Sequence, residues 1–176
     1  MSIQIETQRL LLREMTDDDA PGMFALDSDP KVLTYLHTQP HTDIAQSLAV
    51  IHFVQQQYRD NGIGRWAVLL KDSNTFIGWA GLKLNKTPLN GHVNYLDLGY
   101  RFIPEYWGKG YATEASRVSL SYGFKILKAP VIYAAVMLGN DASQNVLQKV
   151  GFRPVNEFSW DGNTHRWFEC ENRNEG

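Results

Sequence analysis

The chain has 176 residues, and its 17 Lys and Arg against 19 Asp and Glu give a net charge of −2. This near-neutral balance excludes a broad polybasic surface as the main source of affinity, so generic nucleic-acid binding is not expected. The hydrophobic share of 43% is ordinary for a globular protein and excludes a disordered chain. The length fits one domain, and we expect residues 1–176 to form it.

The first half of the chain predicts one strand, two helices and three strands. An apolar run predicts a strand over 9–15, and the acidic segment 16–19 is typical of a helix start, where the helix dipole favours negative charge. Apolar residues at three- and four-residue spacing predict a helix over 43–60. Strand patterns follow over 65–71, 76–84 and 93–103, with the polar joint 84–92 interpreted as a hairpin loop.

The second half predicts two helices and three strands. The helices are expected over 111–126 and 142–150, and a β-branched run between them predicts a buried strand over 131–138. Strands over 153–159 and 164–170 flank Asp161-Gly162, a hairpin turn signal. The order predicts an α/β fold of mixed type on a single sheet, with more antiparallel than parallel neighbours.

The cysteine count and the hydropathy pattern indicate where the chain works. Cys170 is its one cysteine, so an intramolecular disulfide cannot form and the composition suits a reducing cytoplasm. No stretch approaches the ~18 apolar residues of a membrane-spanning helix, and the start of the chain lacks the apolar block of a signal sequence. We expect a cytoplasmic monomer or homodimer with no membrane and no nucleic acid as partner.

A predicted anion site follows the strand 93–103. The loop Trp107-Gly108-Lys109-Gly110-Tyr111-Ala112 leads into a helix. Glycines let the backbone approach a ligand closely, and the free amides of the first helical turn point at a phosphate. A Walker A loop needs Gly-Lys-Ser/Thr, and a Rossmann fingerprint needs three glycines early in a parallel sheet, so neither nucleotide motif fits.

These residues resemble the GCN5-related N-acetyltransferases (GNAT). Gly110-Tyr111-Ala112 is similar to half of that family's pyrophosphate motif. The resemblance extends to the Rim-type branch, which acetylates ribosomal-protein N-termini, over the segments 7–13, 97–100, 106–115, 140–143 and 149–152. Two positions depart from the pattern: Trp107 stands where the family's motif opens with Arg or Gln, and Asp97 stands where the branch usually has the longer Glu.

The resemblance implies a GNAT fold, a mostly antiparallel central sheet flanked by helices, and acetyl-CoA as co-substrate. The pantetheine arm is expected between strands 93–103 and 131–138, with the pyrophosphate on amides around 109–112 and Asn140 bonded to the arm. The residues then expected to bind the co-substrate are Phe102, Ile103, Trp107, Gly108, Lys109, Gly110, Tyr111, Ala112, Thr113, Asn140 and Ser143.

Direct attack of an amine on a thioester needs a neutral amine, a stabilised oxyanion and a proton for the leaving thiolate. Asp97 is the candidate base, acting through water, and Ser143 the candidate acid, with Tyr100 and Tyr111 as rivals. A strand amide near Phe102 is the candidate oxyanion donor. Two plainer interpretations stay open: Asp97 as a strand carboxylate paired with Lys83 or Arg101, and Ser143 as an ordinary helix-start residue.

The cost of the neutral amine separates the acceptor classes. Deprotonating a lysine amine at pH 7 costs roughly 4.6 kcal/mol, against about 1.1 kcal/mol for an α-amine. A carboxylate is a weak base, which favours an α-amine, either of a peptide N-terminus or of an amino-acid-like acceptor, without deciding between them. The resemblance to the Rim-type branch implies a protein N-terminal α-amine of the ribosomal-protein type as the preferred acceptor. A small amine (polyamine, amino acid or aminoglycoside) remains an alternative, as does an acyl-CoA-binding sensor with little turnover.

No metal is expected. His37 and His41 have the four-residue spacing of a zinc helix, but Pro40 between them disfavours helix and no third ligand is near in sequence. Trp66 and Trp79 are expected in the core, and Glu114 is interpreted as a first-turn partner of the helix dipole.

Overall fold

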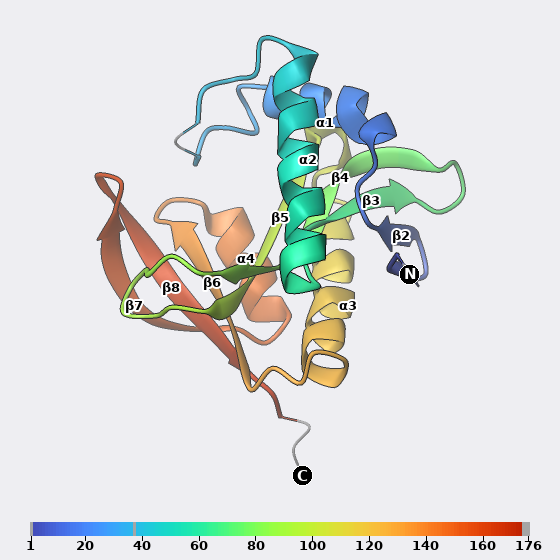
Figure 1. The fold of residues 1–176 in the computed structure, drawn as a ribbon. Helices are drawn as coiled ribbons and strands as arrows, with labels where there is room; N and C mark the ends of the chain where they lie inside the picture. The colour runs from blue at the N-terminus through green and yellow to red at the C-terminus, as the bar shows by residue number, and fades with distance from the viewer. Residues whose placement is uncertain (1, 37, 174–176) are drawn as a thin grey trace.

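The computed structural model describes residues 2–36 and 38–173. These form one eight-stranded sheet in the order β1-β2-β3-β4-β5-β6-β8-β7 (Figure 1). Its strands are β1 (Gln4–Glu6), β2 (Leu10–Arg13), β3 (Trp66–Leu70), β4 (Thr75–Asn85), β5 (Tyr95–Phe102), β6 (Val131–Met137), β7 (Arg153–Trp160) and β8 (Asn163–Glu171). Only the β5–β6 pairing is parallel among these strands, so the expected mixed, mostly antiparallel α/β fold is confirmed.

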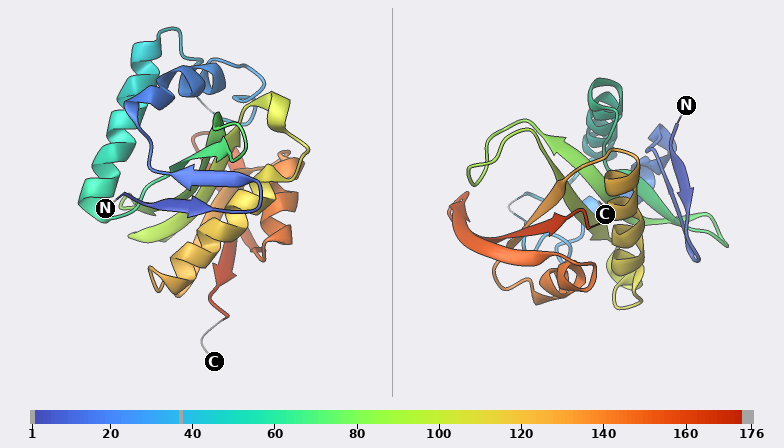
Figure 2. Two further views of the ribbon diagram at one scale, coloured as in Figure 1. Left: turned by 90° about the vertical axis from the view of Figure 1, so that its right-hand side faces the viewer. Right: turned by 90° about the horizontal axis from the view of Figure 1, so that it is seen from below.

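The helices cover both faces of the sheet (Figure 2). α1 (Ala20–Asp27) and α2 (Ile44–Asn61) bury Met23 and Ile51 against Leu69 on one face. α3 (Tyr111–Lys125) and α4 (Asp141–Lys149) bury Leu120 and Leu147 with Leu82 in the core of the other face. Within the described part of the chain, no helix is long and apolar enough to cross a bilayer.

The helix ends follow the sequence signals, with two local differences. The acidic segment forms a short 3₁₀ turn at Asp17–Asp19 before α1, where the Thr16 amide donates to Asp19 Oδ2 at 2.8 Å. Asp43 precedes α2 and accepts from the Ala45 amide at 2.8 Å, as a helix cap does. The short edge strand β1 was not predicted, because its three residues carry too little pattern to be recognised.

The sheet opens between β5 and β6. Asp97 opposite Tyr133 is the single register pair that joins these strands in the described residues. The Ile103 amide donates to the Ile77 carbonyl on β4 at 3.0 Å. Because strand residues alternate in the direction of their backbone groups, the amides of Tyr100 and Phe102 point away from β4, into the gap.

Candidate active site

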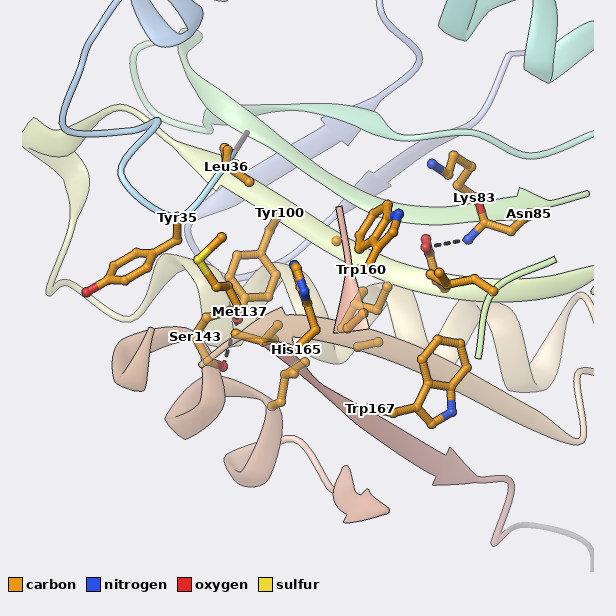
Figure 3. A pocket seen from close by; sticks show the side chains of 18 of the residues that line it. Tyr35, Leu36, Lys83, Asn85, Tyr100, Met137, Ser143, Trp160, His165 and Trp167 are labelled. Atoms are coloured by element: carbon orange, nitrogen blue, oxygen red, sulfur yellow. Dashed lines mark hydrogen bonds between the residues drawn. The ribbon is translucent and has the colours of Figure 1, made fainter. Parts of the chain in front are cut away.

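A cavity of about 440 Å³ lies in the gap between β5 and β6 (Figure 3). The far edge of the gap is also open. The Leu138 amide donates to the Thr164 carbonyl on the β8 side at 3.1 Å, so the alternate residues Ala135 and Met137 direct their backbone groups toward β5. Buried backbone groups require hydrogen-bond partners. The gap therefore suits an extended polar chain lying between the two strands.

The predicted glycine loop leads directly into α3. Gly108 and Gly110 have φ values of 72° and 84°, a left-handed backbone that favours glycine. The helical hydrogen bond from Glu114 runs to the Gly110 carbonyl at 3.1 Å. The amides of residues 111–113 precede that bond, so they have no partner within the helix and form an anion-binding helix start.

Arg9 fixes this loop from the first β-hairpin. Its Nη1 donates to the Lys109 carbonyl at 2.9 Å, and its Nε donates to Glu114 Oε2 at 2.7 Å. Glu114 also accepts from Thr7 Oγ1 at 2.7 Å. Burial opposes ionisation of Glu114, but the hydrogen bonds from Thr7 and Arg9 together lower its pKa. Glu114 is thus an anchor of the loop as well as a first-turn acid, and the opening Thr7–Arg13 match was the sequence signal for Arg9.

The other residues predicted for the co-substrate lie along the route from the gap to the loop. Trp107 Nε1 donates to the Phe102 carbonyl at 2.8 Å, while the indole stays 49% exposed. The Ile103 amide is already bonded to β4, so its binding role is limited to its side chain and carbonyl. Lys109 Nζ lies 5.8 Å from the centre of the Tyr106 ring.

Asp97 is half-buried in the wall of the cavity, and both of its carboxylate oxygens are bonded. Arg65 Nη2 donates to Oδ1 at 2.6 Å, and Asn85 Nδ2 donates to Oδ2 at 2.5 Å. The ion-pair partner is therefore Arg65 rather than Lys83 or Arg101, the two partners considered from the sequence. Arg101 pairs instead with the buried Asp27 at 2.6 Å.

A carbonyl at Gly81 and the missing side chain of Gly99 explain how Arg65 reaches Asp97. Gly81 on β4 lies opposite Gly99 on β5. Arg65 Nη1 donates to the Gly81 carbonyl at 2.6 Å and to the Asp97 carbonyl at 2.8 Å, so the guanidinium lies across both strands. A Cβ at Gly99 would come within 2.7 Å of Arg65 Nη2. The missing side chain therefore makes room for the ion pair.

Tyr100 and Ser143 meet at the other end of the cavity (Figure 3). The Tyr100 hydroxyl lies 2.8 Å from Ser143 Oγ and donates to the Ser143 carbonyl at 3.0 Å. Burial raises the pKa of Tyr100 to about 12, so its proton is present at neutral pH. Asn140 caps α4 by accepting from the Ser143 amide at 3.3 Å. Tyr111, the other rival acid, lies under the Arg9 guanidinium, 4.5 Å from it.

A second cavity of about 310 Å³ adjoins the first on the α2 side. Trp79 was expected in the core. It packs against the core cluster but is only partly buried, and its exposed part lines both cavities. Trp66, in contrast, is fully buried as expected. The second cavity was not predicted, because its residues come from segments that the sequence separates widely.

Within residues 2–36 and 38–173, no group of three His, Cys, Asp or Glu side chains is placed to hold a metal ion. His37 lies outside the described residues. His41 lines the second cavity, and its Nδ1 lies 2.9 Å from Ser47 Oγ.

Comparison with known proteins agrees with this architecture. Residues 9–153 match the family model of the acetyltransferase (GNAT) domain. The chain is 34% identical over 149 residues to the uncharacterised N-acetyltransferase YoaA of Bacillus subtilis (strain 168), covering 85% of this chain and 82% of that protein. It is 39% identical over 141 residues to spermidine N(1)-acetyltransferase of Escherichia coli (strain K12), covering 80% of this chain and 71% of that relative.

Among solved structures, the fold is similar to that of the ribosomal-protein-S5-alanine acetyltransferase from Vibrio fischeri. The TM-score is 0.81 at 20% identity, over 99% of both chains. The family match covers most of the sheet and its helices, and the relatives above 30% identity extend over at least 80% of the chain. The chain belongs to the GNAT acetyltransferase family, and it is an acyltransferase.

Proposed function

We propose that residues 1–176 act as one N-acetyltransferase domain that moves the acetyl group of acetyl-CoA to a primary amine by direct attack. The observation that carries this proposal is the open β5–β6 gap ending beside the glycine loop of α3. An extended pantetheine arm can pair with backbone groups in the gap, while the pyrophosphate accepts from the amides of residues 111–113. Asn140 and Ser143, at the start of α4, are proposed to contact the arm.

The proposed chemistry uses groups that line the same cavity. Asp97 takes the proton of the amine through a water, and its carboxylate is held in place by Arg65 and Asn85. The Phe102 amide, which points into the gap, donates to the developing oxyanion. Ser143 donates a proton to the departing thiolate, and Tyr100, whose hydroxyl lies 2.8 Å from Ser143 Oγ, is the rival acid. Proton transfer and a preorganised amide suffice for this reaction, so no metal is proposed.

The preferred acceptor is an N-terminal α-amine, as in the Rim-type branch. Its support is chemical: a carboxylate is a weak base, and an α-amine loses its proton at a lower pH than a lysine or polyamine amine does. A small amine is the second candidate, supported by the 39% identity to a spermidine acetyltransferase. A sensor that binds acetyl-CoA without turnover is the third, and amine-dependent thiol release distinguishes it from both enzymes.

The co-substrate site is tested by Gly110→Glu. The new side chain places bulk and negative charge where the pyrophosphate would lie, so acetyl-CoA affinity measured by calorimetry should fall by more than about tenfold. Gly62→Glu is the matched control. Gly62 lies at the end of α2 as Gly110 lies at the start of α3, and both have a positive φ, +70° at Gly62 and +84° at Gly110. A Cβ at Gly62 would meet no atom within 4 Å. An affinity for acetyl-CoA in Gly110→Glu equal to that in Gly62→Glu would contradict the proposed loop site.

A further inference from the structure

Positively charged side chains gather where the two cavities meet. The residues that line both cavities are Arg65, Trp79, Lys83 and Arg101. Three of these four are cations. An acceptor that enters through the second cavity must therefore pass them before its amine reaches the β5–β6 gap.

Only two of these cations have an acid partner. Arg65 pairs with Asp97 and Arg101 pairs with Asp27, each at 2.6 Å. The side-chain amine of Lys83 makes no hydrogen bond or ion pair with any residue of 2–36 or 38–173, although it lies within the electrostatic influence of Asp97. Burial lowers the pKa of Lys83, and the nearby Arg65 lowers it further. The charge of Asp97 opposes both effects and favours the ammonium form of Lys83. In that form Lys83 is one cation more than the two carboxylates, Asp97 and Asp27, can pair.

The position of Lys83 is well defined. Lys83 lies directly opposite Asp97 in the β4–β5 register, so both side chains extend from the same face of the sheet. Figure 3 shows it beside Asn85, which binds Asp97. The Trp79 ring makes cation–π contacts with the two neighbouring arginines. Its centre lies 5.6 Å from the Arg65 guanidinium and 5.2 Å from the Arg101 guanidinium. The three cationic side chains, Arg65, Lys83 and Arg101, therefore have a fixed arrangement next to Asp97, the proposed base.

We propose that Lys83 binds a carboxylate of the acceptor, which makes the acceptor an amine with a carboxylate close to its reactive nitrogen. The carboxylate belongs either to a free amino acid or to an acidic residue at a peptide N-terminus. This inference rests on the proposed function, since it places the acceptor amine beside Asp97. A carboxylate supplies the counterion that Lys83 lacks, through a charge-assisted hydrogen bond. A polyamine instead adds positive charge to a site that already has an excess of it.

Matched acceptors test this proposal in the full chain. L-alanine is compared with L-alaninamide, and a peptide beginning Ala-Glu with the same peptide beginning Ala-Gln, so each pair differs in one carboxylate. Spermidine serves as the cationic amine. The readout is kcat/KM from thiol release, for the wild type, Lys83→Met and Lys86→Met. Lys86 is an exposed lysine outside both cavities, and its substitution controls for the loss of a lysine from the same stretch.

The proposal expects the carboxylate member of at least one pair to be preferred by about tenfold or more, which is the effect of one charge-assisted hydrogen bond. The pair that shows the preference identifies the source of the carboxylate. Lys83→Met should lose the preference and Lys86→Met should keep it. A preference for the amide members or for spermidine overturns the proposal, as does a preference that survives in Lys83→Met.

If none of these acceptors is turned over, their binding to the complex of the protein with CoA is measured by calorimetry instead. The same carboxylate preference and the same loss in Lys83→Met are then expected in the dissociation constants. Carboxylate probes that bind no better than their amides overturn the proposal. The proposed function fails differently, by an absence of acetyl-CoA binding or of thiol release with every amine, including spermidine.

Discussion

The guanidinium of Arg65 lies across the backbone of two strands and holds the carboxylate of Asp97 at 2.6 Å. The contact spans 32 positions of sequence and depends on the absence of a side chain at Gly99, where a Cβ would lie 2.7 Å from Arg65 Nη2. Asp97 is therefore oriented by three strands together: the approach to β3 supplies Arg65, and β4 supplies Asn85 as its second donor. These two donors fix the carboxylate in the lining of the cavity in which the amine is proposed to lie.

Asp97→Asn tests the proposed base. The amide keeps nearly the same shape but cannot accept a proton, so kcat should fall by roughly 10²- to 10⁴-fold, the usual contribution of general base catalysis. The affinity for acetyl-CoA should stay within about twofold of the wild type, since Asp97 is not proposed to touch the co-substrate. Steady-state thiol-release assays measure kcat, and calorimetry measures the affinity for acetyl-CoA. Asp72→Asn, at an exposed turn, is the control, and turnover of Asp97→Asn at the control's rate would exclude Asp97 as base.

Gly99→Ala tests whether the Arg65 pair positions Asp97. The added Cβ would meet Arg65 Nη2 at 2.7 Å, and Gly99 lies outside the left-handed region, so the change displaces the guanidinium without backbone strain. We expect kcat to fall about tenfold, the effect of one misplaced charged contact. The measurement is a double-mutant cycle with Arg65→Ala. Gly99→Ala should add little in the Arg65→Ala background, and fully additive losses would show that the two residues act separately.

Tyr100→Phe tests the donor pair with Ser143. Removing the hydroxyl that lies 2.8 Å from Ser143 Oγ should lower kcat by roughly tenfold, the effect of one lost hydrogen bond to a charged or developing group. Ser143→Ala should lower it further if Ser143 is the direct donor. Equal rates for Tyr100→Phe and the wild type with a saturating acceptor would remove Tyr100 from the mechanism.

Tyr100 also predicts a pH dependence of stability. Burial raises its pKa from 10.0 to about 12, so the folded state keeps the proton over a range in which the unfolded chain loses it. The stabilisation by the neutral phenol is complete below pH 10 and is lost as the pH rises through 12. The free energy of unfolding should therefore fall more steeply in the wild type than in Tyr100→Phe over this range. Parallel curves from denaturant titrations would contradict burial of the phenol.

Two substitutions at Asn140 distinguish its structural role as a helix cap from its proposed role in binding acetyl-CoA. Asn140→Asp keeps the oxygen that caps α4 but removes the amide donors, whereas Asn140→Ala loses both. Asn140→Ala should lower the free energy of unfolding by about 1 kcal/mol, and Asn140→Asp should leave it nearly unchanged. If Asn140 binds the pantetheine arm, both variants lose acetyl-CoA affinity. Wild-type affinity in Asn140→Asp would limit Asn140 to the helix cap.

Local patterns predicted much of the fold. The strand, glycine loop and helix around Gly110 were predicted in order, because each element has its signal within a few residues. The spacing of apolar residues likewise predicted α2, and the Asp161-Gly162 turn signal predicted the hairpin of β7 and β8. The β1 strand escaped prediction because three residues at a sheet edge have no usable periodicity.

The site's contacts were harder to predict, because they join segments far apart in the sequence. Nothing near Asp97 in the sequence indicates Arg65, whose path depends on the register of Gly81 opposite Gly99. Trp79 reads as an apolar strand residue, yet it lies between two guanidinium groups at the junction of two cavities. Residue types and spacing could therefore nominate Asp97, but not the cationic surroundings that bear on the choice of acceptor.

The most direct test of the account is acetyl-CoA binding and thiol release measured together on the full chain. Binding is read by calorimetry, and thiol release is followed against N-terminal peptides, free amino acids, lysine peptides, polyamines and aminoglycosides. The account predicts binding, with thiol release that depends on an amine and matches the amount of N-acetylated product. Binding without amine-dependent release across the panel would contradict acetyl transfer, and the absence of binding would contradict the co-substrate site itself.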